Sequence, residues 1–146
     1  MKHTKIIEKN LNKLYKSAKI SDFFKEIPVS AMVFSLKDNT KCYIANNNRQ
    51  KTHNVCGHAE INAIIKAEKS IKDWRLNEYA VFSFLKPCEM CSKIIETVRI
   101  KEIYYIIDQP KINENPKLKY HKIYFPGNKY IEKYDKLFTS FFKKIR

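Results

Sequence analysis

Apolar residues between positions 6 and 24 recur at spacings of three and four, with lysines at many of the positions between them. This spacing places the apolar side chains on one side of a helix, so it predicts an amphipathic α-helix over residues 6–24. Pro28 follows closely and is expected to stop that helix, because the residue before a proline disfavours helical dihedral angles.

Two short apolar runs, residues 29–35 and 41–45, follow the predicted helix. The Lys-Asp-Asn-Thr sequence at residues 37–40 between them is typical of a turn, so the two runs predict a β-hairpin. Further along the chain, residues 79–85 and 103–107 are nearly continuous apolar runs. Such runs are typical of strands that are covered on both faces of a sheet.

Helical periodicity returns at His58, after a polar stretch, and continues to Glu68. Pro87 predicts the start of another helix that continues to Val98, because proline is tolerated in the first turn, where its missing N–H costs nothing. Residues 108–130 are rich in proline, asparagine and lysine and predict a long surface segment. Residues 131–145 predict a basic amphipathic helix.

Helices and strands that alternate after a hairpin predict an α/β sandwich with a mixed sheet. The chain has 146 residues, 44% of them apolar, which is typical of a globular protein with one core. We see neither an internal repeat nor a linker in the sequence. We therefore expect a single domain over residues 1–146.

The net charge of +14 comes mostly from lysine, which is abundant in proteins of AT-rich genomes. The total alone therefore does not identify a polyanionic partner. The distribution is more informative, because residues 111–146 contain 10 basic and 3 acidic side chains. This local surplus favours a C-terminal segment that faces phosphate groups.

The sequence contains no apolar stretch of 18 residues and no secretory signal at its start, so we expect a cytoplasmic protein that does not span a membrane. In that reducing compartment the four cysteines are expected to be thiols or metal ligands rather than disulfides.

Two short motifs, each ambiguous alone, carry the candidate chemistry. His58-Ala59-Glu60 begins one predicted helix, and Pro87-Cys88-Glu89-Met90-Cys91 begins another. A Cys-x-x-Cys pair by itself could be a redox centre or half of a zinc finger. With a histidine it supplies three ligands suited to tetrahedral zinc with one open position, the arrangement of catalytic sites.

Glu60 gains a role if zinc is present, because a carboxylate beside an activated water can take its proton and pass it to a substrate. A geometric condition applies to this pair. Residues two apart on an ideal helix point about 200° apart, so His58 and Glu60 reach the same site only if His58 lies at the irregular edge of the helix.

The two motifs together resemble the signature of the zinc-dependent cytidine and nucleobase deaminases, and more closely that of the bacterial tRNA-specific adenosine deaminases. Other stretches match the second family in order and spacing. They are Ile27-Pro28-Val29, Asn47 at eleven residues before His58, Trp74-Arg75-Leu76 and Phe141-Phe142-Lys143.

The resemblance implies a three-layer α/β/α cytidine-deaminase-like sandwich with a central mixed sheet of about five strands and a basic C-terminal helix. It also implies a homodimer with one zinc ion per subunit. The implied reaction converts the wobble adenosine in the anticodon loop of a tRNA, of the arginine type, to inosine. Zinc hydroxide attacks C6 of the adenine, and the base leaves its stack to reach the metal.

Site residues follow from the same resemblance. His58, Cys88 and Cys91 would hold the zinc ion, and Glu60 would be the proton shuttle. Asn47 would bind the purine edge. The remaining implied contacts are Pro28, Val29 and Leu85 in the wall of the base pocket, and Phe142 and Lys143 against the anticodon loop.

Several positions depart from the pattern of the family without removing a ligand or the shuttle. They are Ser30, Gly57, Lys86, Ser92, Lys93, Ile106, Ile107 and Gln109. These departures leave open a deaminase of a small substrate, such as deoxycytidylate, cytidine or guanine. A second alternative is a non-catalytic zinc-stabilised RNA-binding protein, which would need a fourth ligand such as Cys56.

Other residues that could carry chemistry have simpler interpretations. Cys56 is expected to be structural or incidental, since the family has no ligand there. We expect Cys42 to be a buried thiol in its strand, Trp74 to lie in the core, and His53 and His121 to be solvated.

Overall fold

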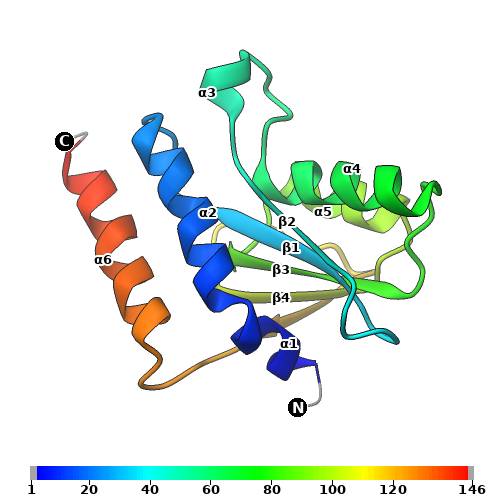
Figure 1. Cartoon of the computed structure of the whole chain (residues 1–146). Helices are drawn as coiled ribbons and strands as arrows, with labels where there is room; N and C mark the ends of the chain where they lie inside the picture. Colours follow the sequence, from blue (N-terminus) through cyan, green and yellow to red (C-terminus); the bar gives the residue numbers. More distant parts are fainter. Residues whose placement is uncertain (1–2, 145–146) are drawn as a thin grey trace.

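The computed structural model of the chain describes residues 3–144. Its elements follow in the order α1 (Thr4–Lys9), α2 (Leu11–Phe23), β1 (Ser30–Ser35), β2 (Cys42–Asn46), α3 (Arg49–Thr52), α4 (Ala59–Ile71), β3 (Tyr79–Leu85), α5 (Glu89–Thr97), β4 (Glu102–Ile107), β5 (Lys119–Lys122) and α6 (Lys129–Lys144) (Figure 1). Among these elements, no helix has the length and apolar character that crossing a membrane requires.

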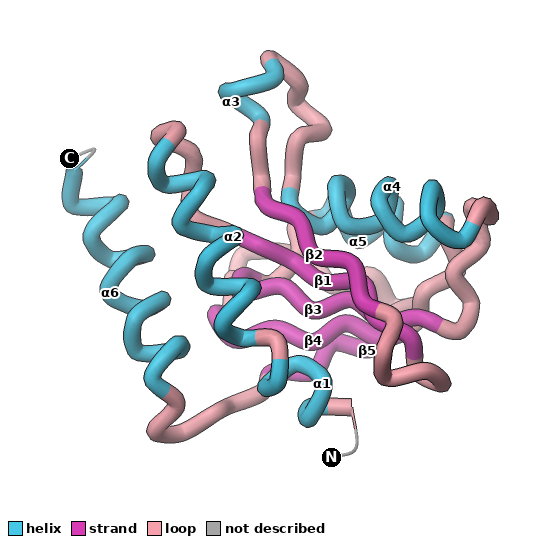
Figure 2. The backbone as a smooth tube through the Cα atoms, viewed as in Figure 1, coloured by secondary structure: helices cyan, strands magenta, loops and turns pink. Residues whose placement is uncertain are grey.

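The five strands form one mixed sheet in the order β2-β1-β3-β4-β5. Strand β1 is antiparallel to both β2 and β3, which confirms the predicted hairpin. Strands β3, β4 and β5 are parallel to one another. Helices α4 and α5 cover one face of the sheet, and α1, α2 and α6 cover the other (Figure 2). The predicted three-layer α/β/α sandwich is confirmed.

Each central strand contributes to two hydrophobic cores. In β1, Ala31 and Val33 pack on the side of α4 and α5, while Met32 and Phe34 pack on the side of α1, α2 and α6. Side chains alternate between the faces of a strand, so a strand covered on both faces needs apolar residues at every position. This explains the nearly continuous apolar runs in the sequence.

The N-terminal helix is interrupted, contrary to the prediction of one helix over residues 6–24. Asn10 separates α1 from α2, and its side-chain amide donates to the carbonyl oxygen of Ile6 at 2.7 Å. Asparagine side chains compete with the backbone for such carbonyl groups, which disfavours them inside helices. The apolar period continues across the break because both pieces pack on the same core.

Helix α2 ends before Pro28 has any influence. Lys25 adopts a left-handed conformation, with φ of 60°. The backbone N–H of Lys25 donates to Asp22 and that of Glu26 donates to Ser21, at 2.9 and 2.8 Å. These are the two hydrogen bonds of a Schellman motif. This motif ends the helix, so the prediction that Pro28 stops it was wrong.

The segment 108–130 was predicted as surface chain, but it contains β5. This edge strand is short and its sequence is Lys-Tyr-His-Lys, which lacks the apolar run of the inner strands. We expected His121, which lies in β5, to be solvated, but it is half-buried. Its ring stacks on Tyr104 at 4.8 Å, and its Nε2 lies 2.5 Å from a carboxylate oxygen of Glu102.

Other local predictions also need correction. Trp74 is 50% exposed rather than buried, and the guanidinium groups of Arg75 and Arg99 lie 5.7 and 5.2 Å from its ring centroid. Cys42 is only half-buried. The closing helix α6 begins at Lys129, two residues earlier than predicted, and Ile145 lies outside the described residues.

Candidate zinc site and its pocket

Two helices begin at the same point of the molecule, and their N-caps are His58 for α4 and Cys88 for α5. His58 has an extended backbone, with φ of −88° and ψ of 147°. Its side chain therefore leaves the chain ahead of the helix rather than from the first turn. This satisfies the geometric condition on His58 and Glu60. Pro87 precedes the N-cap of α5, two residues before the first-turn position predicted for it.

The three candidate ligand atoms converge on one point. The Nδ1 atom of His58 lies 3.9 Å from the sulfur of Cys88 and 3.5 Å from the sulfur of Cys91, and all three atoms lie within 4.8 Å of one another. Ligands of a tetrahedral zinc ion with bond lengths of about 2.1 and 2.3 Å are separated by about 3.5 Å. The donor set and its spacing therefore fit zinc.

A fourth protein ligand is missing from this group. Within residues 3–144, the cluster of potential metal ligands consists of His58, Cys88 and Cys91. Cys56 is exposed and lies outside it. A site with three protein ligands keeps one position for water or substrate, as catalytic zinc sites do.

The local environment favours negative charge on the sulfur of Cys88. The thiol of Cys91 donates to it, and with His58 this lowers the pKa of Cys88 to about 4. The backbone N–H of Cys91 also points at the same sulfur, at 3.5 Å, as expected at a helix N-terminus. The same interactions raise the pKa of Cys91, because Cys88 and burial both favour its protonated form. A thiolate is the form of cysteine that binds metal.

Glu60 lies in the first turn of α4, with only 5% of its surface exposed. Burial raises the pKa of its carboxyl to about 7. The group lies in the same pocket as His58 and Cys88. A carboxyl in this position can hold or release a proton close to neutral pH.

The pocket beside these side chains has a volume of about 190 Å³. Asn47 lines it, and the side-chain oxygen of Asn47 is buried without a hydrogen-bond partner. The backbone of Asn47 is held on both sides, because its carbonyl accepts from the hydroxyl of Ser21 and its N–H donates to Val29. A buried acceptor with no partner costs free energy unless a ligand supplies a donor.

The segment that carries Asn47 packs tightly against the start of α4. A Cβ atom at Gly57 would lie 2.7 Å from the side-chain oxygen of Asn48 and 2.8 Å from the backbone of Arg49. The same oxygen of Asn48 accepts from the amide of Asn62 on α4. The departure from the family at Gly57 thus has a physical reason here, since only glycine permits this approach.

Lys86 also lines the pocket, and its ammonium group is not available to a ligand. It lies 2.6 Å from Glu114 and 3.4 Å from Asp108, and the side chain is 6% exposed. The rings of Tyr105 and Tyr120 flank it at 5.6 and 5.4 Å. The buried lysine therefore ties the segment after β4 to the start of α5. We refer to Lys86, Asp108 and Glu114 as the lysine clasp.

The predicted site residues fall into two groups. Those that line the pocket are Val29, Asn47, His58, Glu60, Leu85 and Cys88, with Cys91 buried beside them. Pro28 is buried and does not line the pocket. Phe142 and Lys143 lie on α6, outside it: Phe142 is half-buried against Phe138 and Phe141, and Lys143 is exposed.

The sequence did not single out five other pocket residues as part of a site: Ile27, Arg49, Gly57, Lys86 and Gln109. Ile27 belongs to a stretch chosen for its resemblance alone. Gln109 was noted only as a departure, yet its side-chain amide donates to the backbone carbonyl of Lys86 at 2.7 Å. Arg49 carried no signal beyond its proximity to Asn47.

Comparisons with known proteins agree with this geometry. Residues 4–107 match the family described as the cytidine and deoxycytidylate deaminase zinc-binding region. The tRNA-specific adenosine deaminase of Rickettsia bellii is 30% identical over 139 residues, which cover 90% of this chain and 96% of that protein. The homologous enzyme of Rickettsia felis is 34% identical over 80 residues, 55% of this chain and 56% of its own length.

Solved structures share the fold. A structure from studies of A-to-I editing by tRNA:A34 deaminases superposes with a TM-score of 0.70 at 23% identity, covering 84% of this chain and all of the other. Guanine deaminase from Nitrosomonas europaea gives a TM-score of 0.74 at 12% identity, over 92% of this chain and 83% of the other. At such low identity, these likenesses establish only that the fold is shared.

Proposed function

The chain belongs to the cytidine and deoxycytidylate deaminase zinc-binding family, and on that premise we propose that it deaminates adenosine to inosine at the wobble position of a tRNA, of the arginine type. The observation that carries the proposal is one pocket that contains a three-ligand zinc site, a buried carboxyl group at Glu60 and the unpartnered oxygen of Asn47. The nearly full-length similarity to a tRNA-specific adenosine deaminase supports tRNA as the substrate.

In the reaction, the oxygen of water bonds to C6 of the purine, the bond from C6 to the amino nitrogen breaks, and ammonia leaves. Zinc held by His58, Cys88 and Cys91 supplies the Lewis acidity that makes water nucleophilic at neutral pH. Glu60 carries the two protons of the water in turn, one to ring N1 and the other to the departing amine.

The rest of the pocket orients the base. The side-chain oxygen of Asn47 can accept a hydrogen bond from the purine edge and so recover the interaction that it lacks. Val29 and Leu85 form part of the apolar wall against which the base packs. The backbone N–H groups at the starts of α4 and α5 favour the negative charge that develops in the transition state.

Further features of the proposal concern the whole protein. The chain acts as one domain and as a homodimer, for which exposed Val55 and Ile65 offer apolar surface. Phe142 and Lys143 on α6 contact the anticodon loop, which is supported by the basic end of that helix. A tRNA substrate places the enzyme in the cytoplasm.

The main alternative is a deaminase of a small nucleotide or base, such as deoxycytidylate, cytidine or guanine. Lys86 lines the pocket but is already paired with two carboxylates, which leaves Arg49 as the pocket cation that the phosphate of deoxycytidylate would need. The comparison of substrates below separates this alternative from tRNA deamination. The non-catalytic alternative needs a fourth metal ligand, and exposed Cys56 lies outside the cluster, which favours an enzyme.

The test compares substrates directly. Zinc-loaded protein is incubated with an arginine tRNA transcript that carries a wobble adenosine, and in parallel with free adenosine, deoxycytidylate, cytidine and guanine. Nuclease digestion and mass spectrometry are expected to detect inosine in the tRNA alone. Deamination of a free nucleotide or base with the tRNA unchanged would refute the proposal.

A further inference from the structure

The C-terminal end of α2 exposes two aromatic side chains that the mechanism does not use. Phe23 is 80% exposed and Phe24 is 42% exposed, and their rings meet edge to face with centroids 5.2 Å apart. Single exposed apolar residues are common on protein surfaces. Two adjacent phenyl rings turned to solvent form an apolar patch that suggests a binding role.

Cations lie near these rings. The ammonium group of Lys51 lies 4.4 Å from the centroid of the Phe24 ring. Lys25, which follows Phe24 in the chain, and Arg49, two residues before Lys51, are both exposed. We call the surface of Phe23, Phe24, Lys25, Arg49 and Lys51 the aromatic rim.

The three cations of the aromatic rim outnumber the two carboxyl groups next to it in the chain, Asp22 and Glu26. Glu26 is 3% exposed, and one of its carboxylate oxygens accepts from the backbone N–H groups of Gln50 and Lys51 at 2.7 and 3.1 Å. The carboxylate is therefore turned inward, and it fastens α3 to the end of α2. Asp22, which directly precedes Phe23, is half-buried.

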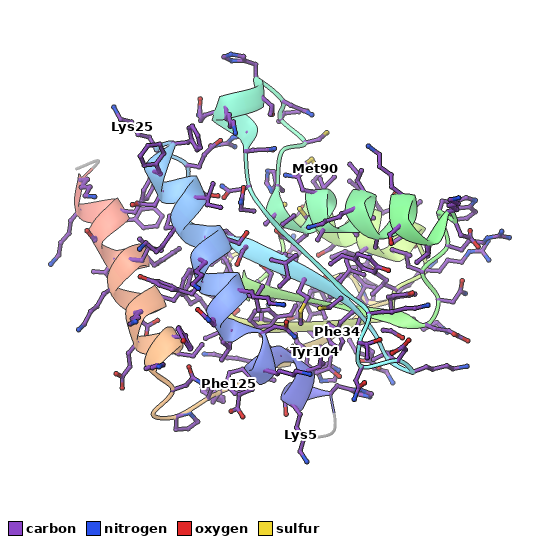
Figure 3. The ribbon with its side chains drawn as sticks, viewed as in Figure 1. Lys5, Lys25, Phe34, Met90, Tyr104 and Phe125 are labelled. Atoms are coloured by element: carbon purple, nitrogen blue, oxygen red, sulfur yellow. The ribbon has the colours of Figure 1, made fainter. Side chains whose placement is uncertain are left out.

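The aromatic rim is continuous with the pocket. Arg49 belongs to both, and Ile27, three residues after Phe24, lines the pocket as well. Figure 3 shows Lys25 at the outer end of α2, on the side of the molecule where α3 lies. Helix α6 packs on α2, and its C-terminal end lies at this same end of the molecule (Figure 1).

We infer that the aromatic rim is a stacking platform for the nucleotides that flank the target base in a single-stranded RNA loop. This inference rests on the proposed function, because it assumes an RNA substrate in the pocket. Phe23 and Phe24 stack on unpaired bases, while Lys25, Arg49 and Lys51 lie against the phosphates. Loops expose unstacked bases to such contacts, and aromatic side chains with nearby cations are the usual means of binding them.

A protein partner fits this surface less well. Stable protein interfaces bury about 800 Å² on each side, far more than two phenyl rings offer. Lysine is also depleted in those interfaces, whereas here Lys51 lies over the Phe24 ring and Lys25 follows Phe24 in the chain. Size and charge both favour RNA.

The experiment measures the affinity of the zinc-loaded protein for a fluorescently labelled anticodon stem-loop RNA. Phe23→Ala is expected to raise the Kd about 10-fold, because one stacked base is lost. Phe23→Trp is expected to bind like the parent protein, since it keeps an aromatic face. Phe23→Leu is expected to bind as weakly as Phe23→Ala, since it keeps apolar surface without a ring.

Tyr124→Ala is the matched control. Tyr124 is 69% exposed, with the ammonium group of Lys122 at 5.5 Å from its ring centroid, so it has the same chemistry at another site. It adjoins Phe125, which Figure 3 shows at the opposite end of the molecule from Lys25. The Kd of this variant is expected to stay within twofold of the parent value.

Three results would overturn the inference: an unchanged Kd for Phe23→Ala, parent-like binding by Phe23→Leu, or a change of oligomeric state in sedimentation of Phe23→Ala. The last would assign the surface to a contact between protein chains. Because binding is measured without turnover, failure of this inference can be told apart from failure of the proposed function. If the parent protein binds RNA through Phe23 but forms no inosine, the inference about the aromatic rim stands and the proposed function fails.

Discussion

Glu60 combines two properties at a single residue. It is buried beside the zinc ligands, and it lies in the first turn of α4, where it lines the pocket. The cost of burying this carboxyl is reflected in its raised pKa of about 7. A purely structural role would favour an apolar residue at this position.

Glu60→Gln separates catalysis from metal binding. The variant keeps the size of the side chain but cannot carry a proton, so the rate of inosine formation is expected to fall at least about 100-fold. The zinc content is expected to remain one per chain, because Glu60 is not part of the ligand cluster. Single-turnover kinetics and metal analysis measure the two quantities.

Glu68→Gln is the control for that experiment, because it makes the same change two turns further along α4, outside the residues that line the pocket. Its rate is expected to match that of the parent protein. Full activity of Glu60→Gln with zinc retained would show that the proton is carried by another group.

At the scale of elements, the attachment of the segment between β4 and β5 depends mainly on the side chain of Lys86. The lysine clasp is buried at Lys86, whereas Asp108 and Glu114 are 41% and 51% exposed. The hydroxyl of Tyr120 adds to the attachment, since it donates to Ser92 on α5 and accepts from the backbone of Asn115. The departures from the family at Lys86 and Ser92 thus belong to one set of contacts.

Lys86→Met is expected to loosen this segment without emptying the zinc site. The two carboxylates regain water when the ammonium group is removed, so the loss is that of hydrogen bonds to a charged group, about 1–3 kcal/mol. Hydrogen exchange at the amides of Ile112, Asn115 and Leu118 is expected to become about 10-fold faster. These amides are hydrogen-bonded within the segment.

Lys37→Met provides the comparison, because Lys37 forms an ion pair with Glu78 in which both side chains are largely exposed. Exposed pairs contribute little to stability. Unchanged exchange in Lys86→Met, or faster exchange in α4 and α5 as well, would contradict a local role for the lysine clasp.

At the scale of the whole molecule, the C-terminal end of α6, the aromatic rim and α3 lie at one end (Figure 1). Lys143 and Lys144, at the basic end of α6, thereby lie at the same end of the molecule as the aromatic rim, although the two are separated in the sequence. A polyanion that binds at this end meets their charge, and the contacts release counterions. Binding should therefore depend on the salt concentration.

Lys143→Ala combined with Lys144→Ala is expected to weaken tRNA binding and to lower the slope of log K against log salt by about 1.4, or about 0.7 for each lost contact with a single strand. Zinc content is expected to remain unchanged. Lys5→Ala combined with Lys9→Ala removes the same charge from α1, at the opposite end of the molecule (Figure 3). An equal loss of affinity in both double variants would indicate an unspecific effect of net charge.

The sequence alone predicted the parts of this protein that depend on local spacing. The apolar periods identified four of the five strands and the helices on both faces, because burial on a regular element repeats at a regular interval. The ligands His58, Cys88 and Cys91 were recognisable from two short motifs, since residue type and spacing restrict metal chemistry. The break at Asn10 was missed because it comes from one side-chain hydrogen bond inside a continuous apolar period, and β5 was missed because it has no apolar run.

The tertiary structure alone decided which further residues complete the pocket around the zinc site. Arg49 and Gln109 reach the pocket from segments without an apolar period. The buried carboxylate of Glu26 accepts from the backbone of Gln50, next to Arg49, and Gln109 donates to the backbone carbonyl of Lys86. The orphaned oxygen of Asn47 is also visible only once its neighbours are placed. Hydrogen bonds and ion pairs between segments far apart in the sequence leave no periodic trace, which is why the sequence predicted the chemistry and the structure defined its pocket.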